Sequence, residues 1–164
     1  MIDMAQRFPV LARGCGRWTG SYTHLDPAGT LIDSHQVDTM SDFPADGSAD
    51  FRLRVHNRWQ DGRESEIELL ADYRNDRLEW RERLIGWMDE FDERTAYLTF
   101  TYASDPSIRV CEMIQVSPDG RSRARTWHWF RDDLLFKITL ARERRAVPDE
   151  RSRTEVEGSN NVGR

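Results

Sequence analysis

Four side chains in the sequence combine the chemistry of a proton-transfer site. Asp33 and His35 lie two positions apart in a segment of alternating apolar and polar residues. Glu112 lies among apolar residues of a second such segment, and Tyr22 belongs to a third. An imidazole titrates near neutral pH, burial raises the proton affinity of a carboxylate, and a phenol can donate to a developing oxyanion. The set predicts general acid/base catalysis, with His35 as acid or base and Glu112 or Asp33 orienting it or taking the complementary proton.

A second set of residues is suited to holding a small, mostly apolar ligand. Alternation within 122–130 places Trp127 and Trp129 on one face together with Arg125, while the other face carries smaller polar groups. We expect the first face to point inward, because two indoles fill a cavity wall better than small polar groups do. Arg125 would hold an anionic substituent of the ligand. The predicted ligand-binding residues are Tyr73, Phe100, Tyr102, Arg125, Trp127 and Trp129.

Alternation also indicates the direction of the predicted catalytic side chains, because successive residues of a strand point to opposite faces. Asp33 and His35 share a face with Val37, and Glu112 shares one with Val110. We therefore expect all three polar groups to point into an apolar interior. Two structural interpretations compete with catalysis: Glu112 could pair with an inward arginine, and His35 could be a hydrogen-bonded core residue.

The elements that must position these side chains are short. About nine alternating segments are separated by turn residues such as Asn75-Asp76 and Asp132-Asp133, a pattern typical of antiparallel barrels and sandwiches. The predicted strands are 16–24, 30–38, 50–59, 64–73, 77–85, 95–103, 108–116, 122–130 and 134–143. Closure of a meander removes exposed sheet edges. The fold class is therefore all-β, with a single antiparallel up-and-down barrel of eight to ten strands.

Both ends of the chain differ from the barrel segment. Residues 1–12 are expected to form a short helical cap, because Met4–Leu11 is amphipathic and Pro9 prevents a long helix. The barrel is expected to span 13–146. Residues 147–164 contain almost nothing to bury, so a disordered tail is expected there.

The start of the first strand, Gly16-Arg17-Trp18, resembles the GxW motif that opens the barrels of the calycin superfamily. The strand pattern and the arginine-rich last segment are similar to those of intracellular, lipocalin-like bacterial barrel proteins. This resemblance implies that Trp18 closes the narrow end of the barrel. It also implies that an arginine of the last strand, Arg142 or Arg144, packs across the Trp18 ring.

The composition excludes several function classes. The 29 acidic and 24 basic residues give a net charge of −5, so the chain lacks the basic excess that drives binding to nucleic acid. No apolar run reaches the roughly 18 to 20 residues that cross a bilayer, and residues 1–10 do not resemble a signal peptide. We expect no membrane partner and a cytoplasmic location. No dinucleotide-, phosphate- or zinc-binding motif is present, so no cofactor and no metal are expected.

The reactive side chains outside the predicted site are few. Cys15 and Cys111 have no CxxC spacing, so neither a zinc site nor a disulfide is predicted. Lys137 is the only lysine of the chain. Its parity is opposite to that of Leu134 and Ile138, which predicts an outward side chain and no Schiff-base chemistry.

These observations favour binding of a small, mostly apolar and aromatic molecule, followed by cofactor-independent lyase, isomerase, dehydratase or cyclase chemistry. The alternative is a carrier that leaves the molecule unchanged. A third interpretation is a solid barrel that acts through its surface or as a homodimer, with Trp59, Trp80 or Trp87 at the interface. It predicts no internal pocket of ligand size.

Overall fold

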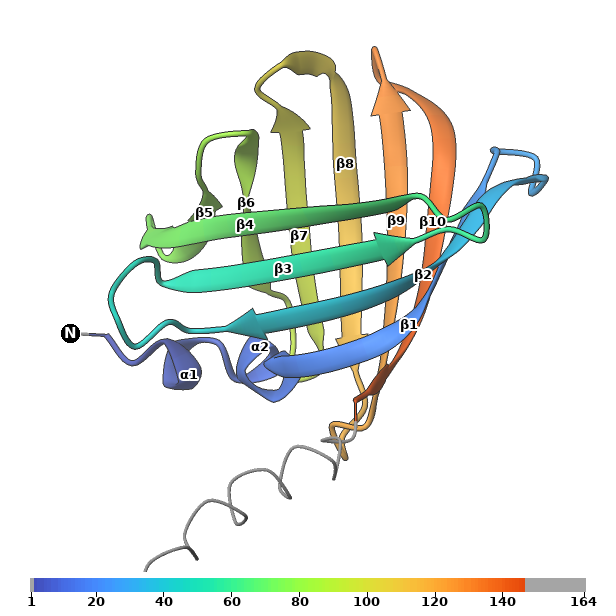
Figure 1. Cartoon of the computed structure of the whole chain (residues 1–164). Helices are drawn as coiled ribbons and strands as arrows, with labels where there is room; N and C mark the ends of the chain where they lie inside the picture. Colours follow the sequence, from blue (N-terminus) through green and yellow to red (C-terminus); the bar gives the residue numbers. More distant parts are fainter. Residues whose placement is uncertain (1, 147–164) are drawn as a thin grey trace, which may run out of the picture.

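Ten antiparallel strands close into one barrel, as predicted (Figure 1). The structure is a computed structural model and describes residues 2–146, so the predicted tail at 147–164 lies outside the described residues. The strands close in the order β1-β10-β9-β8-β7-β6-β5-β4-β3-β2, so each pairs with its neighbours in the chain and β1 pairs with β10. The elements are α1 (Met4–Arg7), α2 (Pro9–Gly14), β1 (Gly16–Leu25), β2 (Leu31–Asp42), β3 (Phe51–Arg58), β4 (Glu64–Arg74), β5 (Arg77–Trp80), β6 (Leu84–Glu90), β7 (Thr95–Tyr102), β8 (Asp105–Val116), β9 (Ser122–Arg131) and β10 (Leu134–Arg145).

The tenth strand is β6, because the predicted segment 77–85 ends as β5 at Trp80, and a separate strand, β6, begins at Leu84 and continues to Glu90, beyond the predicted boundary. Glu82, in the connection between them, has a φ of +61°, and the chain bends there instead of continuing. The predicted hairpin turns are confirmed at Asn75-Asp76 and Asp132-Asp133, where both residues of each pair have positive φ. Positive φ at both central residues gives a turn whose twist matches that of the flanking strands.

Two short helices plug one end of the barrel, which confirms the helical cap (Figure 1). Asp3 caps α1 by accepting from the backbone N–H groups of Ala5 and Gln6, and Pro9 starts α2 at a position that tolerates proline. Phe8 and Val10 are fully buried and pack with Trp18 and the apolar residues of β3 to β8. No helix within residues 2–146 is long and apolar enough to span a bilayer.

Trp18 lies between two guanidinium groups at this plugged end. Its Nε1 donates to the carbonyl oxygen of Gly14 at 2.8 Å, which joins the indole to the end of α2. The Cζ atoms of Arg123 and Arg145 lie 4.7 and 4.5 Å from the ring centroid. Two cation–π contacts and one hydrogen bond thus hold the indole at the end of the barrel that the helices close.

The last-strand arginine over Trp18 is Arg145, so the expectation of Arg142 or Arg144 is wrong. Both of those side chains are exposed on the outer face, because Arg145 has the inward parity of β10 and they do not. Arg145 also fastens the cap and the β8–β9 turn to the barrel, because its guanidinium donates to the carbonyl oxygens of Arg13, Cys15 and Gly120.

The prediction that Lys137 points outward is also wrong, because it assumed that the apolar face of β10 points into the barrel. The apolar residues of the other parity face out, with Leu134 74% and Leu140 40% exposed. Lys137 has the parity of the buried residues Thr139 and Ala141, and its Nζ lies over the ring of Trp129 inside the barrel. Strand β10 therefore has a more polar inner face than outer face.

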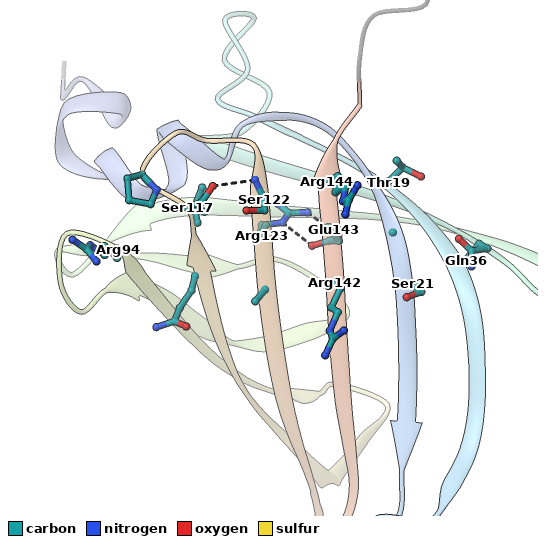
Figure 2. Close-up of a pocket in the computed structure, with 15 residues that line it drawn as sticks. Thr19, Ser21, Gln36, Arg94, Ser117, Ser122, Arg123, Arg142, Glu143 and Arg144 are labelled. Carbon is teal, nitrogen blue, oxygen red and sulfur yellow. Dashed lines mark hydrogen bonds and ion pairs between the residues drawn. The ribbon is translucent and has the colours of Figure 1, made fainter.

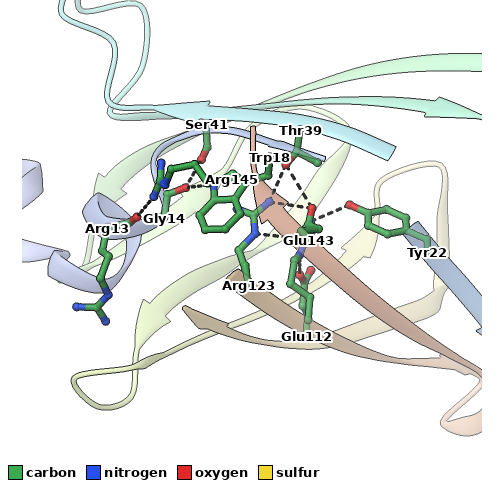
Figure 3. A network of polar contacts seen from close by, with 11 residues as sticks. Arg13, Gly14, Trp18, Tyr22, Thr39, Ser41, Glu112, Arg123, Glu143 and Arg145 are labelled. Atoms are coloured by element: carbon green, nitrogen blue, oxygen red, sulfur yellow. Dashed lines mark hydrogen bonds and ion pairs between the residues drawn. The ribbon is translucent and has the colours of Figure 1, made fainter. Parts of the chain in front are cut away.

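A layer of buried ion pairs crosses the barrel above Trp18 (Figure 3). Arg123 donates to both carboxylate oxygens of Glu143 at 2.7 and 2.9 Å and to Thr39 Oγ1 at 2.6 Å. The second pair joins Arg125 Nε to Glu112. Arg125 also donates to the phenol oxygen of Tyr22 at 2.7 Å, and its Nη1 lies 3.6 Å from Glu143 Oε1.

These charges are almost completely removed from water, with side-chain exposures of 6% or less. Burial by itself would raise the pKa of Glu143, but the charges of Arg125 and Arg123 and hydrogen bonds from Arg123 and Thr39 outweigh it and lower that pKa below 4.5. The Glu143 carboxylate therefore stays ionised, and its hydrogen bonds are made inside the barrel. Removing one partner would leave an uncompensated charge inside the barrel.

Glu143→Gln is therefore expected to lower the free energy of unfolding by about 3–5 kcal/mol, the usual effect of breaking a buried pair. Glu68→Gln, which removes the exposed partner of Arg54, is the matched control and should cost less than about 1 kcal/mol. Urea denaturation measures both. Similar small losses for the two variants would contradict the role of the buried layer.

The same carboxylate gives a pH dependence. Its pKa is lowered in the folded state, so its contribution to stability is complete above its ordinary value of 4.5 and is lost as pH falls through the folded pKa. Denaturation between pH 7 and 3 should show a steeper acid loss in the wild type than in Glu143→Gln.

Candidate functional site

A cavity of about 320 Å³ occupies the barrel on the far side of the buried ion pairs from the helices. Its outermost residues, such as His24, Trp59 and Tyr102, come from strand ends distant from α1 and α2. Eight of the predicted site residues line it: Tyr22, His35, Phe100, Tyr102, Glu112, Arg125, Trp127 and Trp129. This confirms the predicted inward faces of β2, β7, β8 and β9. Tyr73 does not reach the cavity, because it packs against Phe8 near the helices and donates to Asp76.

His35 lines the cavity and pairs with Asp33. Asp33 itself does not line the cavity and its side chain is 37% exposed, so the expectation that it points into the apolar interior is wrong. His35 Nδ1 lies 3.4 Å from Asp33 Oδ2, and its Nε2 lies 3.1 Å from Asn57 Oδ1. Trp59 Nε1 donates to the same Asp33 oxygen at 2.8 Å, and its ring lies against the imidazole with centroids 4.3 Å apart. The hydrogen bond from Trp59 lowers the pKa of Asp33, assisted by a hydrogen bond from His35. Asp33 is thus an ionised carboxylate that orients the buried imidazole.

A second imidazole, His24, joins the site through Thr139. Trp129 Nε1 donates to Thr139 Oγ1 at 2.9 Å, and His24 Nδ1 lies 2.7 Å from the same oxygen. Because an indole only donates, the hydroxyl accepts from Trp129 and keeps its own proton for His24 Nδ1. Burial, followed by the charges of Lys137 and His35, lowers the pKa of His24 to about 4. His24 is therefore a neutral base beside His35, with ring centroids 5.3 Å apart.

Lys137 is the functional candidate that the sequence analysis missed. Its Nζ lies 3.8 Å from the centroid of the Trp129 ring, and the side chain lines the cavity. Burial lowers its pKa, and the negative charge of Asp33 offsets only part of that effect. Within residues 2–146 no carboxylate lies within ion-pair distance of this amine. The signal that could have found it is the pairing of β10 with β9, since Lys137 is opposite the inward Trp129.

The charged side chains at the bottom of the cavity, in the ion-pair layer, neutralise one another. Glu112 is held by Arg125, and Arg125 is in turn shared with the phenol of Tyr22. Burial raises the pKa of Tyr22 despite the nearby Arg125 charge, so the phenol stays protonated. The structural interpretation of Glu112 as the partner of an inward arginine therefore describes its contacts, and His24, His35 and Lys137 are left as the groups able to exchange protons in the cavity.

Two indole N–H groups of the cavity lining lack a partner. Among the described residues, Trp80 Nε1 and Trp127 Nε1 are buried donors without an acceptor. A buried donor left unsatisfied costs roughly 1–3 kcal/mol. A ligand that brings an acceptor oxygen would recover that loss.

Three of these side chains lie close enough together to hold a metal ion. One ligand atom each from His24, Asp33 and His35 falls within 4.8 Å of the other two, a donor set that suits a divalent transition metal. In the structure these atoms have protein partners instead: Thr139 for His24, Asn57 for His35 and Trp59 for Asp33. The absence of a metal site stays a prediction.

A second hollow, on the outer wall of β1, β8, β9 and β10, has different chemistry (Figure 2). It is an open depression of about 840 Å³ whose lining includes Arg94, Arg142 and Arg144. Figure 2 shows Ser117 and Ser122 between Arg94 and the two arginines of β10, and Ser21 on β1 beyond Arg142. Its surface is polar and cationic, so an apolar molecule would not prefer it to the aromatic cavity inside the barrel.

The state of His24 can be tested by NMR titration of the four histidine rings. We expect His24 to titrate near pH 4 and Lys137→Met to raise that value, because the charge of Lys137 is one of the causes of the shift. Between pH 6.5 and 4 the unfolded chain binds a proton that the folded chain does not, so this imidazole should reduce stability as pH falls through that range. Titration near pH 6.5 in the wild type would contradict the burial of His24.

No protein-family model and no curated protein matches the sequence. The solved structures that share its fold include the following two. An S-type phycobiliprotein lyase from Guillardia theta has a TM-score of 0.67 at 14% identity, covering 84% of this chain and 91% of its own. A DUF3598-family protein of unknown function from Nostoc punctiforme has a TM-score of 0.64 at 13% identity over 83% of this chain. That match covers 49% of the Nostoc protein, so the present chain spans about half its length. At these identities the likeness shows the fold alone.

Proposed function

We propose that the protein binds a small, mostly apolar and aromatic molecule inside its barrel. The observation that carries the proposal is the cavity of about 320 Å³ with aromatic walls. Trp127 and Trp129 meet with ring centroids 5.9 Å apart, and Tyr102 is stacked on Trp129 at 6.5 Å. The volume is at the lower end of the roughly 300–1,000 Å³ of small-molecule pockets, which fits one or two fused rings better than a long chain.

The polar groups of the cavity define the polar part of this ligand. The unpartnered indole N–H groups of Trp80 and Trp127 favour a molecule with an acceptor oxygen. Arg125, earlier predicted to hold an anionic substituent, already binds Glu112 and Tyr22. A neutral ligand with one or two oxygens therefore suits the site better than a dianion.

The cavity argues against a barrel that is filled and acts only through its surface. The indole of Trp80, considered as an interface residue, is 8% exposed and lines the cavity. Trp59 is held by Asp33 and His35 at the same cavity. Both indoles line the cavity, and neither is available as the centre of a homodimer interface.

Acid/base transformation of the bound molecule is the second candidate, and a carrier role is its alternative. The observation that favours transformation is the pair of imidazoles at one wall. Neutral His24 can accept a proton, and His35 is oriented by the ionised Asp33. Placing two such groups against one apolar pocket provides both a base and an acid within reach of one ligand.

Binding is tested by filling the cavity. Val110→Phe adds a ring to the cavity wall and should weaken binding of a neutral aromatic probe such as cinnamyl alcohol by about tenfold or more, equivalent to about 1.4 kcal/mol. Leu140→Phe adds the same ring to the outer face and is the matched control. Quenching of tryptophan fluorescence and native mass spectrometry report binding. Equal affinities for both variants, or no binding by the wild type, would overturn the proposal.

Catalysis is tested on the molecules that bind. If the protein is an enzyme, a panel of aromatic acids, alcohols and terpenoids should contain a compound that the wild type converts. His24→Gln and His35→Gln should then bind this compound while reducing its conversion at least about a hundredfold, the lower end of what general acid/base groups contribute. Recovery of every bound compound unchanged from the wild type would establish the carrier alternative.

A further inference from the structure

We propose that Lys137 forms a reversible Schiff base with the carbonyl group of an aromatic or conjugated aldehyde bound in the barrel cavity. The inference rests on the proposed function, because it names the reactive group of the same ligand. It uses the one lysine in a chain of 164 residues, which stands inside the cavity.

The position of Lys137 exposes its amine to a ligand. The side chain crosses the face of Trp129, and Nζ lies 3.8 Å from the ring centroid. Trp129 is stacked with Tyr102, so the amine is placed beside the aromatic walls where a ring would be held. A planar conjugated aldehyde lying along these walls would bring its carbonyl carbon to the amine.

The surroundings of Lys137 favour nucleophilic reactivity. An amine attacks a carbonyl only in its unprotonated form, and burial lowers the pKa of this lysine. Within residues 2–146 no ion pair holds it as an ammonium group. Each unit by which the pKa falls gives about ten times more free amine at neutral pH.

His24 is placed to assist the proton transfers of the reaction. It pairs with Thr139 across β1 and β10, two positions from Lys137 on the same inward face. It is close enough for the Lys137 charge to lower its own pKa, and it is neutral above about pH 4. A neutral imidazole can carry both nitrogen protons to oxygen, the first when the carbinolamine forms and the second when the hydroxyl group departs.

The step balances without a further reactant. The Nζ lone pair forms a bond to the carbonyl carbon while the C=O π electrons move to oxygen, giving a carbinolamine after one proton moves from nitrogen to oxygen. The nitrogen lone pair then forms the C=N bond as the C–O bond breaks, the second nitrogen proton passes to the departing hydroxyl group, and the oxygen leaves as water. The product is an imine, and hydrolysis by the reverse path releases the aldehyde.

Reductive trapping tests the proposal in the full-length protein. The wild type is incubated with cinnamaldehyde and sodium cyanoborohydride at pH 7, and intact mass and peptide mapping locate the adduct. The mass should rise by that of the aldehyde minus one oxygen, with the label on Lys137. The α-amine of Met1 is the internal reference for a nonspecific reaction.

Two variants distinguish the reaction of Lys137 inside the cavity from the ordinary reactivity of an exposed lysine. Lys137→Met removes the nucleophile, and the double variant Lys137→Met/Arg142→Lys places a lysine on the exposed outer face of the same strand. We expect labelling of Lys137 in the wild type to be at least about tenfold faster than labelling of the introduced lysine, because the cavity holds the aldehyde beside the amine and burial lowers the pKa of that amine. Excess cinnamyl alcohol, which has no carbonyl group, should slow labelling of Lys137 and leave the surface lysine unchanged.

The outcomes distinguish this inference from the proposed function. If cinnamyl alcohol binds in the cavity but Lys137 is trapped no faster than the surface lysine, the Schiff base is ruled out and ligand binding stands. If neither compound binds, both fail. Fast labelling of Lys137 that cinnamyl alcohol does not slow would also overturn the inference, since the aldehyde would then react outside the binding site.

Discussion

The buried pairs of Arg123 with Glu143 and of Arg125 with Glu112 determine how the inside of this barrel is used. Desolvated charges are tolerable only when fully paired, so these four residues must form a fixed layer across the interior. Below the layer, Trp18 and the N-terminal helices fill the barrel. Above it, the neutralised layer serves as the bottom of an aromatic cavity.

How far the interior could be predicted from sequence depended on which face of each strand was the more apolar. The face of β9 was predicted correctly because Trp127 and Trp129 outweigh their neighbours in volume. The face of β10 was predicted wrongly because Leu134 and Leu140, its most apolar residues, lie outside and exposed. Its inner face carries Glu143, which pairs with the buried Arg123, and Lys137, which lines the cavity. Alternation determines which residues share a face, but the rule that the more apolar face points inward fails for β10, because its inner face contributes to the buried ion pairs.

The candidate site was predictable as a set of inward residues, and its pairings were not. Eight of the ten predicted residues line the cavity, because strand alternation depends only on local sequence. Whether a carboxylate faces a ligand or an arginine depends on contacts across the barrel: Glu112 and Arg125 are on neighbouring strands, but the phenol of Tyr22 that completes their group is 103 positions away from Arg125. The same applies to Thr139, which links Trp129 to His24 and carries no motif of its own. Long-range hydrogen bonds of this kind decide which groups are left for chemistry.

The most direct test of this division between a closed end and a binding end is an NMR titration of the six indole N–H groups with cinnamyl alcohol. Trp80 and Trp127, whose N–H groups lack partners, should shift as the ligand binds, together with Trp129. Trp18, which donates to Gly14 below the ion-pair layer, should not shift. Shifts of Trp18 and of the outer-surface Trp87, with Trp80 and Trp127 unchanged, would contradict the account.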